Sequence, residues 1–163
     1  MSGKQAHFII PGEPKGKGRP RFSTGMTKGG KPFTTVRSPD DTIVYENLVR
    51  LEYERQCHGI YFEKDIPVAV EVRAYYQIPK SVSKKRTKTM LSGETRPLKR
   101  PDTDNVLKSI LDAMNGFAFY DDSQVTDISA SKYYSDAPRV EVTVKEVRGA
   151  PVCGDIINQP ERG

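Results

Sequence analysis

Runs of alternating or β-prone apolar residues predict four strands in this chain. Residues 67–78 and 139–147 alternate apolar and polar side chains, and residues 125–134 are similarly rich in β-branched and aromatic types. Near the start, residues 6–10 form a short apolar run that Pro11 and the following glycine end. Because alternate side chains point to opposite faces of a strand, these segments are expected to build a sheet with one buried face.

Two other segments carry apolar residues at helical spacing. The first is expected to begin with Ser38 as N-cap and Pro39 at the first helical position, and to run to about Cys57. Its expected buried stripe comprises Ile43, Leu48, Leu51 and either Tyr45 or Val44. The second covers residues 103–115 and is closed by Gly116, a residue type suited to the position just after a helix.

The predicted elements follow one another in an order that is typical of an α+β fold. We expect a single domain over residues 1–148, with a mostly antiparallel sheet covered by two helices. Residues 13–37 and 80–100 read as two glycine- or lysine-rich loops, the first with a short strand or hairpin near residues 31–36. Residues 149–163 are polar and contain two prolines, so they are expected to form a disordered tail.

Composition narrows the class of protein. The 163 residues carry a formal net charge of +5, which suits an anionic partner. Cys57 and Cys153 are too few for a disulfide framework, and no apolar run reaches the roughly 20 residues that a membrane span needs. Without a recognisable signal peptide at the N-terminus, a reducing cytoplasm is the expected location.

The positive charge is concentrated in the two loop segments. Neither contains a Gly-Lys-Ser/Thr motif at the spacing of a nucleotide-binding P-loop, so no nucleotide cofactor is expected. These side chains either contact nucleic-acid phosphates or lie on solvated, mobile loops. The expected DNA-binding residues are Lys15, Lys17, Arg19, Arg21, Lys84, Lys85, Arg86, Lys99 and Arg100.

Acidic residues follow the second basic segment directly. Asp102 and Asp104 open the second predicted helix, and Asp121 and Asp122 follow its end after a short turn. In isolation such aspartates are common helix caps and turn residues. Inside a basic protein, however, carboxylates would repel DNA unless they held a cation such as Mg²⁺, which prefers oxygen ligands and often binds one or two carboxylates.

Lys108 lies four residues after Asp104, on the same side of the predicted helix. It could form an ion pair with Asp104 worth about 0.3–0.5 kcal/mol, or place a positive charge next to a scissile phosphate. Phe119 and Tyr120 are expected in the core, with wedging against DNA bases as the alternative.

The segment 102–108, with the sequence Asp-Thr-Asp-Asn-Val-Leu-Lys, and the segment 121–125, Asp-Asp-Ser-Gln-Val, together resemble the RusA family of Holliday-junction resolvases. The segment Ile10-Pro11-Gly12-Glu13-Pro14 with Lys17-Gly18-Arg19-Pro20-Arg21 is similar to the start of phage and prophage members. The resemblance covers about residues 7–147.

This resemblance implies a homodimeric crossover junction endodeoxyribonuclease of recombination and repair. It implies Mg²⁺, with Mn²⁺ as a substitute, and paired symmetric nicks in four-way DNA. Carried over by position, Asp102, Asp104 and Asp122 would be catalytic, metal-binding carboxylates and Lys108 a catalytic lysine. Two alternatives stay open: a non-catalytic DNA-binding module of phage recombination or replication, and a small RNA-processing metallonuclease.

Overall fold

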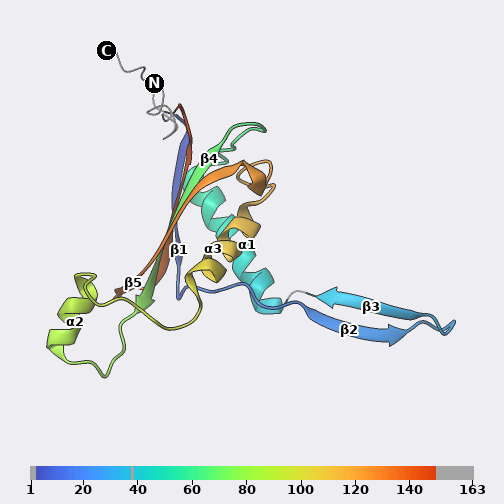
Figure 1. The fold of residues 1–163 in the computed structure, drawn as a ribbon, viewed down its shortest axis with the longest axis horizontal. Coiled ribbons are helices and arrows are strands. Elements are labelled where there is room, and N and C mark those ends of the chain that lie inside the picture. Colours follow the sequence, from blue (N-terminus) through green and yellow to red (C-terminus); the bar gives the residue numbers. More distant parts are fainter. Residues whose placement is uncertain (1–2, 38, 150–163) are drawn as a thin grey trace, which may run out of the picture.

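A four-stranded sheet forms the centre of the computed structural model, which describes residues 3–37 and 39–149. Its strands, in spatial order, are β1 (Gln5–Pro11), β6 (Arg139–Glu146), β4 (Val68–Gln77) and β5 (Val125–Ser135). The first two neighbouring pairs are antiparallel, whereas β4 and β5 run parallel (Figure 1). The four predicted strands and the α+β class are confirmed.

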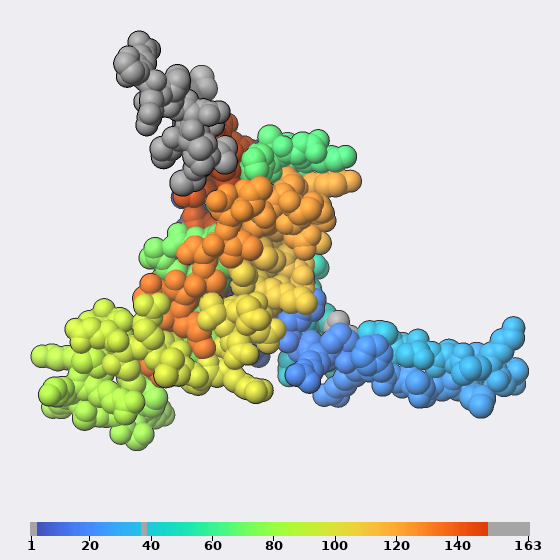
Figure 2. Space-filling model, in the orientation of Figure 1, coloured from blue at the N-terminus to red at the C-terminus, as the bar shows by residue number. Residues whose placement is uncertain are grey.

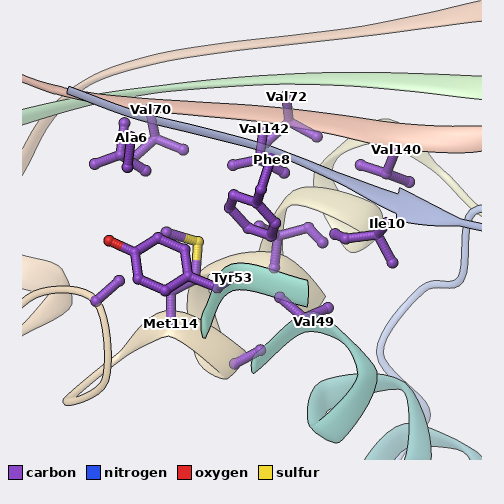
Figure 3. Packing of buried hydrophobic residues seen from close by; sticks show 14 of the residues in the cluster. Ala6, Phe8, Ile10, Val49, Tyr53, Val70, Val72, Met114, Val140 and Val142 are labelled. Atoms are coloured by element: carbon purple, nitrogen blue, oxygen red, sulfur yellow. The ribbon is translucent and has the colours of Figure 1, made fainter. Parts of the chain in front are cut away.

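The core lies between one face of this sheet and the helices α1 (Asp40–Cys57) and α3 (Thr103–Met114). Strands β4 and β6 alternate buried and more exposed residues, so their valines point toward the helices. Figure 3 shows Phe8 of β1 packed among these valines and Tyr53 of α1, and the two rings meet edge to face at 5.1 Å. The predicted amphipathic pattern of the strands therefore builds the core directly.

Helix α1 has the predicted span, but its start and its buried face differ from the prediction. Pro39 occupies the N-cap rather than the first helical position, and Ser38 lies outside the described residues. Ile43 and Leu51, both predicted to be buried, are 45% and 62% exposed, whereas Tyr45 rather than Val44 is buried. The side chains that the helix buries are Thr42, Tyr45, Val49, Glu52, Tyr53 and Cys57. This stripe was hard to predict because it mixes aromatic, polar and charged residues.

Helix α3 agrees more closely with the prediction. Gly116 follows it with a φ of +71°, a conformation that favours glycine. Phe119 is fully buried as expected, whereas Tyr120 is 55% exposed, so its assignment to the core was wrong. The free thiol of Cys57 is buried and contacts the carbonyl of His7.

Two segments project from this core at the same end of the molecule. The strands β2 (Arg21–Met26) and β3 (Pro32–Arg37) form a separate antiparallel hairpin, longer than the predicted one. The second basic segment contains a helix, α2 (Lys84–Leu91), which we did not predict. Ser83 caps it by accepting a hydrogen bond from the Arg86 N–H. Figures 1 and 2 show the hairpin and the α2 lobe extending in different directions.

None of the helices in the described part of the chain has the length and apolar character that crossing a membrane requires. The predicted tail falls almost wholly on residues 150–163, which lie outside the described residues.

Candidate active site

Asp102 and Asp104 lie at the start of α3, as predicted. Asp102 occupies the N-cap position, but its carboxylate makes no capping hydrogen bond. Both side chains belong to exposed residues, and within the described chain neither forms an ion pair. The capping explanation for Asp102 is therefore wrong in its simplest form, and its carboxylate oxygens are available to a ligand.

The position of Asp102 is fixed from the interior of the sheet. The hydroxyl of Tyr76, a buried residue of β4, donates a hydrogen bond of 3.0 Å to the carbonyl of Pro101. Burial, followed by the negative charges of Glu13 and Asp102, raises the pKa of Tyr76 to about 12. The phenol therefore keeps its proton at neutral pH and can remain the donor.

A cleft of about 620 Å³ lies beside Asp102, between the starts of α1 and α3. The first basic segment forms one of its walls, and Arg100 lies next to the acid. The charged and polar side chains that line the cleft include Lys15, Arg19, Asp41, Arg100, Asp102 and Asn105. Exposed carboxylates and several cations thus share one open hollow.

Two glycines allow the basic segment to lie this close to the helices. A Cβ on Gly16 would be 2.4 Å from Asn105 Nδ2 and 2.9 Å from Pro101 Cβ. A Cβ on Gly18 would be 2.6 Å from Pro39 Cγ, and its N–H donates to Thr42 Oγ1 at 3.0 Å. A larger residue at either position would have to push the segment away from the cleft.

The two acids of the second pair, Asp121 and Asp122, have different surroundings. Asp121 caps a short 3-10 helix (Asp122–Gln124): its carboxylate accepts hydrogen bonds from the N–H and hydroxyl of Ser123, which lower its pKa. Gln124 reciprocates by accepting from the Asp121 N–H at 2.9 Å. Asp122 has no such task, and its exposed side chain is free of hydrogen bonds and ion pairs within the described chain.

Asp122 nevertheless lies at the other end of α3 from Asp102. Its N–H donates to the side-chain oxygen of Asn115, the C-cap residue of that helix. A helix of 12 residues is about 18 Å long, far more than the spacing of ligands around one ion. In the described part of the chain, no group of three or more His, Cys, Asp or Glu side chains is placed to hold a metal.

The predicted basic residues do not form one continuous surface. Lys17 forms an ion pair with Asp112, whose side chain is half-buried. Lys99 lies 5.4 Å from the ring centre of Tyr76, near the cleft. In contrast, Arg21 belongs to the hairpin and Lys84, Lys85 and Arg86 to α2. Lys108 is exposed on α3 and forms no ion pair with Asp104 in the described structure.

Several residues that support the candidate site were not predicted. Tyr76 was expected only as part of a strand, and Lys132 places its Nζ 5.0 Å from the centre of the Tyr76 ring. The Gln124 side chain donates to the carbonyls of Glu63 and Ile66, and so anchors the turn that carries Asp122. The only sequence signal for these roles was the position of Gln124 within the Asp-Asp-Ser-Gln-Val segment.

Free carboxylates beside a cation-lined cleft are typical of a nuclease that acts on a polyanion, rather than of a plain DNA-binding surface. The sequence model of the family "Endodeoxyribonuclease RusA" matches residues 11–145. The chain therefore belongs to the RusA family, and it is an endonuclease of the Holliday-junction-resolving class. Nucleases of this family depend on a divalent metal ion.

The chain is also similar to two individual proteins. "Uncharacterized protein YqaN" of Bacillus subtilis (strain 168) is 38% identical over 142 residues, which are 86% of this chain and 95% of that protein. "Crossover junction endodeoxyribonuclease rusA" of Lactococcus phage r1t is 33% identical over 87 residues, covering 53% of this chain and 60% of the phage protein.

Proposed function

We propose that this protein is a Mg²⁺-dependent, structure-selective endonuclease that resolves four-way DNA junctions by paired symmetric nicks in recombination and repair. Its products would be ligatable ends with 5′-phosphates and 3′-hydroxyls, and its place would be the cytoplasm, where such junctions arise. The observation that carries the proposal is the free carboxylate of Asp102 in the lining of the basic cleft, with the free carboxylate of Asp104 two residues further along the chain.

These side chains suit a hard divalent cation. Mg²⁺ is commonly held by one or two carboxylates, with waters and substrate phosphates as its remaining ligands. A bound Mg²⁺ would activate a water and offset the charge that develops on the scissile phosphate. Asp102 and Asp104 would hold the ion, and Lys108 would supply a fixed positive charge nearby. Arg100, Lys15 and Arg19 would hold the DNA backbone across the cleft.

The position of Asp122 supports the proposed homodimer. Within one copy of the chain, Asp122 lies about one length of α3 away from Asp102 and Asp104. A two-fold axis that sets the α3 helices of two copies side by side and antiparallel would place the C-terminal end of one beside the N-terminal end of the other. We propose that each active site combines Asp102 and Asp104 of one copy with Asp122 of the second. Two such sites would serve the two opposed strands of a junction.

The test is cleavage of a synthetic four-way junction with and without Mg²⁺ or Mn²⁺. Wild-type protein should cut in either ion and not in a chelator, and Asp104→Asn should bind the junction without cutting it. Glu54→Gln, which removes one exposed carboxylate from α1, is the matched control and should cut normally. Binding without cleavage by the wild type in both ions would favour the DNA-binding module.

RNA processing is distinguished in the same format. Four-way DNA, duplex DNA and an RNA hairpin compete in one reaction, and the junction should be consumed first. Efficient turnover of RNA with the junction left intact would refute the proposed substrate.

A further inference from the structure

The net positive charge of the protein is concentrated in the two segments that project from the core, the β2–β3 hairpin and the segment that contains α2. Residues 21–37, the hairpin segment, contain four Lys or Arg and no Asp or Glu. Residues 80–100 contain eight Lys or Arg and one acidic residue, Glu94. Because the whole chain carries +5, the remaining residues together carry −6. DNA is therefore attracted to the projections and the basic cleft and repelled elsewhere.

The hairpin also carries an exposed apolar face. Phe22 pairs with Val36, and Met26 with Pro32, so alternation places all four on one side of the ribbon. Phe22 is 72% exposed, Met26 74% and Val36 57%. Such a cluster on a two-stranded ribbon gains nothing from the core, and exposed apolar patches usually mark a binding surface.

The opposite face of the hairpin differs in character. It carries Arg21, Ser23 and Thr35, and near the tip the ring of Phe33 lies against Gly25, at whose position a Cβ would be 2.7 Å from Phe33 Cζ. Phe33 is nevertheless 47% exposed, less than Phe22 at 72% and Met26 at 74%. The larger exposed apolar surface therefore lies on the face of Phe22 and Met26.

The position of the hairpin relative to the cleft indicates that ligand. Arg19 lines the cleft and Arg21 begins β2, so the ribbon leaves the protein two residues from the candidate active site. Strands of six residues reach about 20 Å, and a two-stranded ribbon fits the major groove of a duplex, which is about 12 Å wide. With no acidic residue, the hairpin is complementary in charge to DNA rather than to an apolar or cationic partner.

We propose that this hairpin probes the branch point of the junction. Phe22 and Met26 stack on bases at the crossover, whose faces are open because the duplex stack is interrupted there, while Lys28 and Lys31 near the tip contact phosphates. Apolar side chains that enter DNA commonly act in this way, as wedges between base steps. The proposal rests on the proposed function, because it takes four-way DNA as the substrate, and it assigns recognition of branched over linear DNA to the hairpin.

The experiment measures binding rather than cleavage, in the Asp104→Asn background. Junctions carry the fluorescent base 2-aminopurine next to the crossover, and affinities for junction and duplex DNA are measured in parallel. Binding should raise the fluorescence through unstacking. Phe22→Ala with Met26→Ala should remove this rise and lower junction affinity by about tenfold or more, with little effect on duplex affinity.

Three control variants separate the effect of the apolar face from the effects of charge and of hairpin folding. Ser23→Ala, on the opposite face, should change neither readout, and Phe22→Trp should retain both. Lys28→Ala with Lys31→Ala should weaken junction and duplex binding equally and flatten the salt dependence. Equal losses on both DNAs for the Phe22 and Met26 variant would overturn the proposal. So would its conversion to a monomer in sedimentation, since the apolar face would then contact a second copy. Failure of junction cleavage in the wild type, with the fluorescence rise intact, would count against the endonuclease alone.

Discussion

Mixing two inactive variants tests whether the active site is shared between chains. Asp102→Asn and Asp122→Asn are each expected to abolish cleavage, because every site in either homodimer lacks one carboxylate. In a mixed dimer the two substitutions fall in the same site if Asp122 acts across the two-fold axis. The other site then holds Asp102, Asp104 and Asp122 intact.

The size of the recovery follows from counting sites. Random reassembly of equal amounts gives about half mixed dimers, each with one complete site out of two, so about a quarter of the wild-type sites return. The mixture should nick one strand of the junction rather than resolve it by paired incisions. Cleavage is measured in a single turnover after the two proteins are denatured and refolded together, with nicked and resolved products separated on a gel.

A matched pair sharpens the result. Asp102→Asn mixed with Asp104→Asn should show no recovery, because both substitutions lie at the N-terminal end of α3 and each site of the mixed dimer lacks one acid. If the Asp102→Asn and Asp122→Asn mixture is no more active than its components, although gel analysis shows mixed dimers, the shared site is refuted. Normal cleavage by Asp122→Asn alone would remove that residue from the site altogether.

Three further predictions concern the scaffold. Gly16→Ala should reduce junction cleavage with little loss of thermal stability, because the added Cβ would meet Asn105 and Pro101 and displace the basic segment. Steady-state kinetics and a melting curve measure the two effects, and unchanged cleavage would contradict the prediction. Phe8→Ala should lower the free energy of unfolding by about 3–5 kcal/mol in a urea titration, because the ring is fully buried against Tyr53, and a loss below about 1 kcal/mol would count against this packing. Glu52, whose pKa is lowered by its hydrogen bond to Arg55, should contribute stability above the ordinary glutamate pKa that is lost as the pH falls through the lowered value. Glu52→Gln should therefore flatten the melting temperature between about pH 3 and 5, and an unchanged acid limb would rule out this contribution.

The sheet and helix α3 could be predicted because their patterns are simple. Val68–Gln77 alternates cleanly, and the helix that Gly116 terminates has apolar residues at regular spacing. Helix α1 was found as an element but not in its orientation, since it buries Glu52 and Thr42 and leaves Leu51 exposed. Thr42 accepts a hydrogen bond from the Gly18 N–H, a tertiary partner that no local pattern reveals, whereas Glu52 is paired with Arg55 on the same helix.

Helix α2 was missed for a related reason. Lys84–Leu91 contains six polar residues and only two apolar ones, so it lacks the stripe on which helix prediction relies. The candidate acids could be selected by residue type and spacing, because Asp102, Asp104 and the turn acids stand out in a basic chain. Their separation in space also follows from the predicted helix, because Asp102 and Asp104 open it and Asp122 follows its end, about 18 Å away for a helix of 12 residues.

The hydrogen bond from Tyr76 to Pro101 links the end of α3 that carries the proposed site directly to the protein interior. A small disturbance of the sheet near β4 would be transmitted to the carboxylate beside it before the fold was lost. Enzyme turnover would thus report on the integrity of the core more sensitively than melting would. Variants selected only for retained folding could therefore still be inactive, with every acidic residue in place.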